Sequence, residues 1–364
     1  NFTGLGNYSR YVADILCHFY PENDYVLYAP KKRENKRMNL LTGQYRQLTL
    51  AYPATSFWKK LSSLWRVWGI TSQLEKEGIE LFHGLSNELP LNIHKSRIKS
   101  IVTIHDLIFL RYPQYYQSID RKIYTYKFRK ACENADKIIA ISECTKRDII
   151  RYFNIPDDKI EVVYQGCDVS FTHPVTEEKK EEVRKKYQLP DHYILNVGSI
   201  EERKNILAAV QALPMLPQHI HIVIVGRRTG YTEKVEQFIK DNGLGERVHI
   251  ISNVPFNDLP AFYQSAEIFV YPSRFEGFGI PIIEALYSGI PVVAATGSCL
   301  EEAGGPDSIY VNPDDITGLA DAFKQIYSNS DKRKNMVEKG REFAKRFSEK
   351  QQSEEIINIY KKLI

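Results

Sequence analysis

Two adjacent cations stand where the sequence predicts a strand to end and a helix to begin. Arg203 and Lys204 follow a strand-like run that ends in Gly198, and they open the next helical pattern. A helix N-terminus combined with Arg and Lys side chains is a good site for a diphosphate. An ordinary charged loop is the alternative, because Glu201 and Glu202 could neutralise the two cations. Taken alone, the segment leaves both interpretations open.

A second strand-end segment carries two glutamates with seven residues between them, Glu276 and Glu284. Gly277 and Gly279 let the backbone approach a ligand closely, and Pro281 suits a first helical turn. Carboxylates at such positions can accept hydrogen bonds from the hydroxyls of a sugar or a ribose. Glu284 could instead only complement the helix dipole, but its neighbours are apolar, where an idle carboxylate would be costly. The pattern therefore favours ligand binding.

The first half of the chain offers weaker signals. His105 and Asp106 directly follow the apolar run 101–104. A His beside an acid can donate or orient hydrogen bonds, although a single strand-end His is as often structural. Gly4 and Gly6 form a loop before a helical pattern and could place backbone N–H groups at an anion. That signal is weak because no strand precedes these glycines here.

Alternating apolar runs and helical patterns must position these residues. Short apolar runs predict buried parallel strands at 25–29, 101–104, 137–141, 160–164, 193–197, 220–225, 248–251, 268–271 and 291–294. Two successive series of this kind predict an α/β fold of two doubly wound domains facing one another. Ligands of such sheets bind outside the carboxyl ends of the strands, which is where the candidate residues lie.

A highly charged segment, 172–190, marks the junction of the two domains. Glu181 with Lys185, and Glu182 with Lys186, have the spacing of ion pairs on a solvated helix. We therefore expect an N-terminal domain over 1–170 and a C-terminal domain over 171–346. Ser142 follows a strand-like run and is expected to cap the helix after it.

The composition narrows the class of protein. The chain has 364 residues and a net charge of +4, which permits an anionic ligand without requiring a nucleic acid. No apolar run approaches 18 residues, so the sequence excludes a membrane span. The five cysteines form no CxxC pair, which favours reduced thiols in a cytosolic protein.

All three tryptophans lie in one short basic segment. Trp58, Leu61, Trp65 and Trp68 recur at helical spacing, and Lys59, Lys60 and Arg66 lie among them. Because Trp is usually well buried, the pattern favours a helix packed on the first sheet. The alternative is an interfacial helix that meets an anionic membrane.

With these motifs the chain resembles the retaining glycosyltransferases of family 4, which have the fold of two Rossmann-like domains called GT-B. The resemblance covers nearly the whole chain and rests on four segments in combination: the glutamate pair with Gly-Phe-Gly, Arg-Lys-Asn, Gly-Leu-Gly and His-Asp. It implies transfer of a hexose, with mannose favoured, from a GDP- or UDP-linked sugar to a hydroxyl of a glycan or lipid-linked acceptor. It further implies retention of the anomeric configuration, a role in cell-surface polysaccharide synthesis, and a place in the cytoplasm or at the inner face of the membrane.

The resemblance also assigns roles in donor binding. It implies that Arg203 and Lys204 hold the diphosphate, that Glu284 binds the ribose, and that Glu276 holds hydroxyls of the transferred sugar. It places further donor contacts at Gly198, Gly277, Phe278 and Gly279.

The resemblance also implies roles for residues outside the diphosphate and glutamate segments. Gly4 and Gly6 would line the phosphate or acceptor side, and His105 would contact the sugar near the reacting carbon. Backbone at Asn253 and Val254 would lie near the nucleobase. The final helix, within 347–364, would cross back onto the first domain.

The sequence shows no DxD-like cluster at a strand end, so we expect no essential metal and no other cofactor, with two cations neutralising the leaving group. The alternatives are a non-hydrolysing nucleotide-sugar epimerase or a phosphorylase-like enzyme on the same fold. A protein of another class, a non-catalytic binding partner that kept the scaffold, is a further alternative. A dinucleotide dehydrogenase is disfavoured because the only GxG segment lacks its preceding strand.

Overall fold

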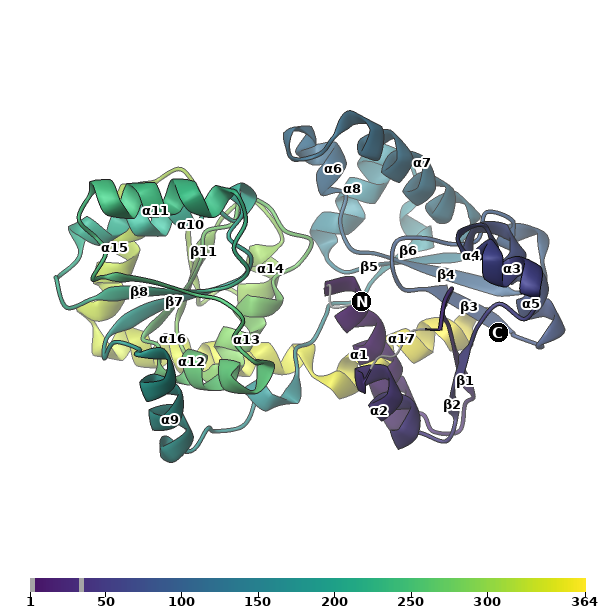
Figure 1. Ribbon diagram of the computed structural model, residues 1–364, viewed down its shortest axis with the longest axis horizontal. Coiled ribbons are helices and arrows are strands. Elements are labelled where there is room, and N and C mark those ends of the chain that lie inside the picture. Colours follow the sequence, from purple (N-terminus) through teal and green to yellow (C-terminus); the bar gives the residue numbers. More distant parts are fainter. Residues whose placement is uncertain (1–3, 33–35) are drawn as a thin grey trace. The chain divides into compact units, whose positions relative to one another are not determined.

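The computed structural model describes residues 4–32 and 36–364 and divides the chain into two compact units. Unit 1 consists of Asn1–Tyr164 and Glu349–Ile364, and unit 2 consists of Gln165–Ser348. Each unit is built on parallel strands with helices on both faces (Figure 1). The predicted α/β class with two doubly wound domains is confirmed, because the apolar runs form strands and the periodic segments form helices.

Unit 2 contains one parallel sheet with the strand order β12-β11-β10-β7-β8-β9. Its strands are β7 (Tyr193–Val197), β8 (His221–Val225), β9 (Val248–Ile251), β10 (Ile268–Tyr271), β11 (Val292–Ala295) and β12 (Ile309–Val311). Its helices are α9 (Glu177–Tyr187), α10 (Ile206–Ala212), α11 (Tyr231–Asp241), α12 (Leu259–Ser265), α13 (Ile280–Ser288), α14 (Leu300–Gly304), α15 (Ile316–Tyr327) and α16 (Ser330–Ala344). Figure 1 shows α10, α11 and α15 on one face of this sheet and α12, α13 and α16 on the other. Fully buried aliphatic side chains, such as those of Ile222 and Val270, form the core.

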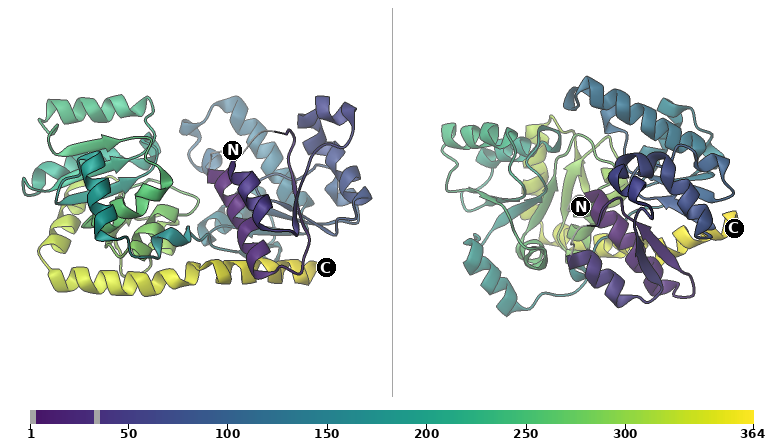
Figure 2. Two further views of the ribbon diagram at one scale, coloured as in Figure 1. Left: turned by 60° about the horizontal axis from the view of Figure 1, so that its bottom comes forward. Right: turned by 45° about the vertical axis from the view of Figure 1, so that its right-hand side comes forward.

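Within residues 4–32, 36–164 and 349–364, unit 1 contains two separate parallel sheets, one with the order β1-β2 and one with the order β3-β4-β5-β6. Its strands are β1 (Tyr25–Tyr28), β2 (Leu48–Ala51), β3 (Leu81–Gly84), β4 (Lys99–Ile104), β5 (Lys137–Ala140) and β6 (Ile160–Val162). Its helices are α1 (Gly4–Phe19), α2 (Lys36–Gln44), α3 (Ser56–Lys60), α4 (Ser62–Leu64), α5 (Ile70–Lys76), α6 (Ile108–Arg111), α7 (Ser118–Asn134), α8 (Glu143–Phe153) and α17 (Glu349–Leu363). The C-terminal helix α17 packs on α1 in this unit through Ile356 and Ile357, so the predicted return to the first domain is confirmed (Figure 2).

All nine strands that the sequence predicts are present, with ends shifted by a residue or two. Three further strands, β2, β3 and β12, are not predicted from the sequence. These strands are short, and polar residues such as Thr49 and His83 interrupt the apolar pattern that identifies a buried strand.

Local features follow the sequence in part. Ser142 caps α8 as predicted, because its Oγ accepts a hydrogen bond from the backbone N–H of Thr145 at 3.0 Å. On α9, the predicted pair of Glu181 with Lys185 forms at 3.3 Å. The predicted pair of Glu182 with Lys186 is wrong. Glu182 instead forms an ion pair with Lys179 at 2.9 Å. Lys186 forms one at 2.8 Å with Asp258, which lies in the turn before α12.

Candidate functional site

The strand order of unit 2 reverses at the boundary between β7 and β10. From β7 the sheet continues to β8 and β9 on one side, and from β10 to β11 and β12 on the other. Open α/β sheets bind ligands at such a reversal, outside the carboxyl ends of the strands. There β7 leads into Gly198 and the 3₁₀ turn η6 (Glu202–Lys204), and β10 leads into the loop that contains Ser273 and Glu276.

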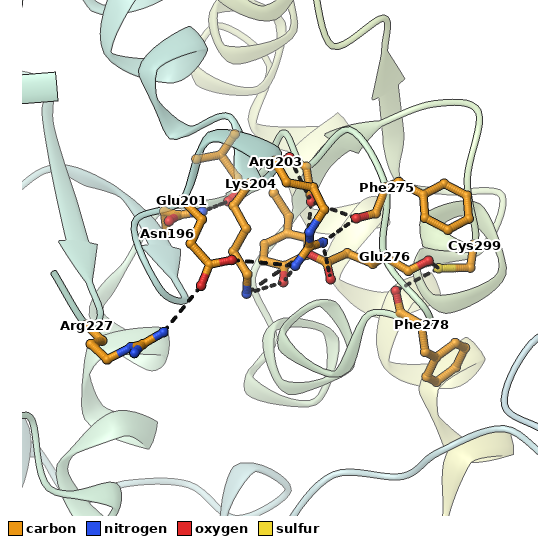
Figure 3. Close-up of polar contacts among 12 residues, drawn as sticks. Asn196, Glu201, Arg203, Lys204, Arg227, Phe275, Glu276, Phe278 and Cys299 are labelled. Carbon is orange, nitrogen blue, oxygen red and sulfur yellow. Dashed lines mark hydrogen bonds and ion pairs between the residues drawn. The ribbon is translucent and has the colours of Figure 1, made fainter. Parts of the chain in front are cut away.

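Arg203 and Lys204 converge on the carboxylate of Glu276 (Figure 3). Arg203 Nη1 lies 2.7 Å from Glu276 Oε2, and Lys204 Nζ lies 3.9 Å from Glu276 Oε1. Lys204 donates to Tyr271 Oη at 3.1 Å, and that hydroxyl donates to Glu276 at 3.2 Å. Ser273 Oγ donates to the same carboxylate at 2.8 Å. The structure thus brings together three of the predicted catalytic residues, and it adds Tyr271 and Ser273.

The charges of this cluster keep one another ionised. The side chains of Arg203, Lys204 and Glu276 are only 15%, 18% and 14% exposed. Burial alone raises the pKa of Glu276, but the charges of Lys204 and Arg203 outweigh it and hold that pKa below its usual range. Burial lowers the pKa of Arg203, but the negative charge of Glu276 more than offsets this effect and raises it. Burial also lowers the pKa of Lys204, and its interactions with Tyr271 and Glu276 raise it overall. Two cations against one carboxylate leave an excess positive charge, which suits an anionic ligand.

Asn205 fixes the turn that carries the two cations. Its backbone adopts the left-handed conformation with φ of 55°, which Asn tolerates better than most residues. Its side-chain amide donates to the carbonyls of Pro272 at 3.2 Å and Pro313 at 2.7 Å. The backbone N–H of Arg274 donates to the carbonyl of Arg203 at 2.9 Å. Together these bonds join the η6 turn to the loop after β10.

Gly198 and Gly226 allow the ends of β7 and β8 to approach closely. A Cβ at Gly226 would lie 1.7 Å from the carbonyl oxygen of Gly198. Gly198 itself has φ of 153°, and a Cβ there would lie 2.8 Å from Lys204 Nζ. A side chain at Gly198 would therefore be strained by its backbone conformation and would crowd Lys204.

The loop that carries Glu276 is held in place through contacts of its backbone carbonyl groups with Cys299. Cys299 Sγ lies 3.0 Å from the carbonyl oxygen of Glu276 and 2.9 Å from that of Phe278 (Figure 3). Phe278 is buried, and a Cβ at Gly279 would lie 3.0 Å from that of Ala303. Cys299 is distant in sequence and has no motif around it, so no sequence signal points to this role.

Glu284 lies on α13 in a different electrostatic environment. Tyr263 Oη donates to Glu284 Oε2 at 2.6 Å. Burial raises the pKa of Glu284 to about 7, although the hydrogen bond from Tyr263 acts in the opposite direction. This carboxyl group therefore changes charge near neutral pH.

Acidic and polar neighbours complete the carboxyl edge of unit 2. Glu201 lies 3.8 Å from Arg203 and 3.5 Å from Arg227, so it offsets part of the positive charge, as the charged-loop alternative supposed. Asn253 and Val254 follow β9, and Asn253 is exposed with φ of 60°. Their predicted role at a nucleobase stays a prediction.

His105 follows β4 in unit 1 and is only 7% exposed. Its backbone N–H donates to Asn87 Oδ1 at 2.7 Å, and its Nε2 lies 2.9 Å from the carbonyl oxygen of Leu85, which requires the proton on Nε2. Burial lowers the pKa of His105 to about 4, although the bond to Leu85 acts in the opposite direction. The imidazole is therefore neutral at pH 7 and can orient hydroxyl groups without adding charge.

The glycine segment of unit 1 differs from the prediction. The helix α1 begins at Gly4, so Gly4 and Gly6 lie in its first turns and not in a loop before it. The reason is that the apolar face of the helix, which includes Tyr8 and Val12, is anchored in the core close to its amino end. Any anion contact at these glycines would have to use N–H groups of the first helical turn.

The tryptophan segment forms α3, α4 and then a π-helical turn η1 (Trp65–Gly69). Trp65 is 1% exposed and donates from its indole N–H to Gln73 at 3.1 Å, so the predicted packing on the first sheet is confirmed for this residue. Trp68 is 48% exposed. A row of large apolar side chains shares this exposure: Phe57, Leu61, Leu64 and Trp68.

Within residues 4–32 and 36–364, no three His, Cys, Asp or Glu side chains gather closely enough to hold a metal ion. None of the helices in those ranges combines the length and the hydropathy that a bilayer-spanning helix needs. All five cysteines are buried free thiols.

Comparison with known proteins identifies similar chains for both units. Residues 9–171 match the family model "Glycosyltransferase Family 4", and residues 177–343 match "Glycosyl transferases group 1". The chain is 31% identical to the O-antigen chain mannosyltransferase B of Escherichia coli over 78% of this chain and 74% of that protein. It is 29% identical to the O-antigen chain mannosyltransferase RfbU of Salmonella typhimurium over 62% of this chain and 60% of that protein. A glycosyltransferase structure from Rickettsia africae superposes with a TM-score of 0.80 at 21% identity, covering 99% of this chain and 95% of that chain, which supports the fold.

Proposed function

We propose that this chain, which belongs to glycosyltransferase family 4 and is a glycosyltransferase, moves a mannosyl group from a nucleotide diphosphate sugar to a hydroxyl of a growing surface polysaccharide or its lipid-linked precursor. The observation that carries the proposal is the cluster of Arg203, Lys204 and Glu276 at the strand reversal of unit 2. Mannose and the polysaccharide acceptor are supported by the names of the two bacterial relatives.

The chemical barrier in such a transfer is the negative charge that builds on the departing diphosphate. Arg203 and Lys204 are fixed and mostly shielded from water, where preorganised donors stabilise such charge most. We infer that they replace a metal ion in this role, and that Glu276 orients sugar hydroxyls while remaining ionised. Retention of the anomeric configuration and a contact of His105 with the sugar remain part of this proposal, supported by the family resemblance.

The donor can be identified without knowing the acceptor. A thermal-shift comparison of GDP, UDP, GDP-mannose and UDP-hexoses is the experiment, because a ligand at 100 times its Kd adds about 2.7 kcal/mol of stability. We expect GDP-mannose to give the largest shift, with and without EDTA. Absence of any shift with all nucleotides would contradict donor binding. A shift that needs Mn²⁺ would contradict metal independence.

We also propose that unit 1 touches an anionic membrane through the row Phe57, Leu61, Leu64 and Trp68. These side chains are 61%, 38%, 44% and 48% exposed. They lie along the consecutive short helical segments α3, α4 and η1, with Leu61 between the first two. Exposed basic residues flank the row, and the sequence between Thr55 and Leu74 contains no acidic residue. An apolar row flanked by basic side chains is typical of helices that lie in the headgroup region of anionic lipids. The buried free thiols fit a reducing compartment and hence the cytoplasmic face.

Vesicle flotation tests the membrane contact. We expect the chain to float with vesicles of phosphatidylglycerol and phosphatidylethanolamine, and the double variant Leu64→Glu/Trp68→Glu to remain in solution. The matched control is Leu40→Glu, which alters a residue that is 73% exposed on α2, outside the row. Equal flotation of all three proteins, or no flotation of the unaltered chain, would contradict this contact.

A further inference from the structure

A network of polar side chains crosses the apolar core of unit 1. Its members come from four elements: Tyr360 of α17, His83 of β3, Thr103 of β4 and Tyr8 of α1. His83 Nδ1 lies 2.6 Å from Tyr360 Oη, and His83 Nε2 lies 2.8 Å from Thr103 Oγ1. Thr103 Oγ1 in turn lies 3.4 Å from Tyr8 Oη. We call these four side chains the His83 network, because a hydroxyl group bonds to each nitrogen of that ring.

The His83 network lies among aliphatic side chains, where polar groups are costly. Tyr8 is 5% exposed and belongs to the same core cluster as Ile101 of β4 and Ile356 of α17. Thr103 is fully buried within β4. Apolar side chains would fill these positions without needing hydrogen-bond partners. The retention of four polar groups here indicates a role besides packing.

His83 carries no charge at neutral pH. Burial, together with the smaller effect of the nearby His105, lowers the pKa of His83 to about 3. A neutral imidazole has a single N–H, so one ring nitrogen donates while the other accepts. Burial holds the pKa of Tyr360 well above its usual value, so this phenol keeps its proton and donates to Nδ1. The Nε2–H group then donates to Thr103, which gives the network one direction.

The His83 network reaches His105 in two ways. The ring of Tyr8 meets the ring of His105 edge-on, with the centroids 4.6 Å apart and the planes at 89°. Leu85, whose carbonyl accepts from His105 Nε2, lies two residues after His83 and directly past β3. The orientation of the His105 ring therefore depends on Tyr8 and on the end of β3, and the network contacts both.

We propose that His83 is a positioning residue that fixes the ring orientation and the tautomer of His105. Its bonds to Tyr360 and Thr103 hold the end of β3 and the Tyr8 ring in place. The proton of His105 then stays on Nε2, and Nδ1 stays an acceptor for a hydroxyl group. This inference rests on the proposed function, in which His105 contacts the transferred sugar.

Variants that remove one hydroxyl group test the His83 network with little change of shape. Thr103→Val removes the hydroxyl that His83 contacts, Thr103→Ser keeps it, and Tyr360→Phe removes the phenol at the other ring nitrogen. Tyr126→Phe, at a residue of α7 that is 56% exposed, is the matched control. We expect Thr103→Val and Tyr360→Phe to lower kcat about tenfold while KM for the donor changes by less than about twofold. Thr103→Ser and the control should keep kcat within about twofold of wild type.

Long-range ¹⁵N–¹H NMR correlations report the tautomer of His105 without any need for turnover. The protein is labelled with ¹⁵N-histidine, and the signals of His105 are assigned from a His105→Gln variant. At pH 7 we expect wild type and Thr103→Ser to show the Nε2–H tautomer alone. Thr103→Val and Tyr360→Phe should show exchange between the two tautomers. If Thr103→Val does not fold, Tyr360→Phe carries both measurements with the same expected results.

An unchanged Nε2–H tautomer in Thr103→Val and Tyr360→Phe would overturn the proposal, even if both variants lose thermal stability. Equal kcat of Thr103→Val and Thr103→Ser would overturn it as well, because the hydroxyl would then be irrelevant to turnover. Failure of the proposed function gives a different result, since wild type would then neither bind a nucleotide diphosphate nor transfer a sugar. In that case the tautomer of His105 alone decides the positioning role of His83.

Discussion

The loop after β10 and the helix α13 that follows it each carry one glutamate of the pair, and the two carboxylates are in opposite electrostatic states. Glu276 in the loop faces Arg203 and Lys204, which hold its pKa below the usual range despite burial. Glu284 on α13 faces Tyr263, and burial raises its pKa to about 7. Their spacing in the sequence gives no indication that the two carboxyl groups differ in pKa. The surroundings make one a permanent anion and the other a group that titrates near neutrality.

This difference indicates separate roles. A carboxylate fixed in an ion pair can orient sugar hydroxyls, but its charge is already compensated and does not oppose a diphosphate beside it. A carboxyl group that titrates near pH 7 gains acceptor strength as pH rises, which suits reversible contact with ribose hydroxyls. The following predictions test whether the two regions act in these ways.

The largest effect is expected for Arg203→Ala. Removing one preorganised donor from a site where charge develops costs about 2.7–4 kcal/mol, or roughly 10²–10³ in kcat. Steady-state kinetics with the donor found by thermal shift measure it. Lys240→Ala, an exposed cation at the end of α11, is the matched control and should retain full activity. Near-normal turnover of a folded Arg203→Ala protein would contradict the proposal that Arg203 stabilises the charge on the departing diphosphate.

A smaller effect is expected for Glu284→Gln. A hydrogen bond to a charged group is worth about 1.5–3 kcal/mol, so the Kd of the nucleotide should rise by roughly 10- to 100-fold at pH 8. At pH 6, where the wild-type carboxyl is mostly protonated, the two proteins should differ little. Calorimetric titration at both pH values measures this, with Glu338→Gln on α16 as control. A difference in nucleotide Kd that does not depend on pH, or no difference at all, would contradict a contact between Glu284 and the ribose.

Asn205→Gly tests the frame of the cation turn. Glycine keeps the left-handed backbone but removes the two amide hydrogen bonds to Pro272 and Pro313. We expect a loss of about 1–3 kcal/mol in unfolding free energy, because two carbonyls lose their donor. We also expect kcat to fall by about tenfold while KM changes less, because misplacement of Arg203 and Lys204 weakens transition-state contacts most. Loss of stability with unchanged kcat would make Asn205 purely structural.

The smallest effect on activity is expected from the pH dependence of stability. The pKa of Glu284 is raised from 4.5 to about 7 in the folded chain, so the native state binds this proton more tightly than the unfolded state. Its contribution to stability is therefore full below about pH 4.5 and is lost as pH rises to about 7. The change is on the order of 3 kcal/mol. Urea unfolding at pH 5 and pH 8 should reveal it as a difference between wild type and Glu284→Gln; parallel pH dependence of the two proteins would contradict it.

The sequence predicts the sheet of unit 2 well because buried parallel strands are continuous apolar runs. The runs 193–197 and 268–271 coincide with β7 and β10, and the residues after them form the site. Arg203, Lys204 and Glu276 are identifiable because strand-end position and side-chain chemistry point in the same direction. What the sequence does not reveal is the partners of these residues. Cys299 reaches the Glu276 loop through a long-range contact that no local pattern encodes.

Periodicity was a weaker guide in the tryptophan segment. It groups Trp58, Leu61, Trp65 and Trp68 on one face, but Trp65 is buried and Leu64 is exposed. A break at Leu61 and the π-helical turn η1 shift the register, and neither leaves a clear signal in the residues. Which side of a short helix faces the sheet depends on packing that periodicity alone does not contain.

The central claim is that Arg203 and Lys204 bind the diphosphate of the donor. Calorimetry with GDP against GMP, and UDP against UMP, measures the contribution of the second phosphate directly. For the preferred base, we expect the diphosphate to bind at least about tenfold tighter than the monophosphate, a difference of about 1.4 kcal/mol, and Arg203→Ala and Lys204→Ala each to remove most of that preference. The same ratio of diphosphate to monophosphate affinity in wild type and both variants would contradict the account.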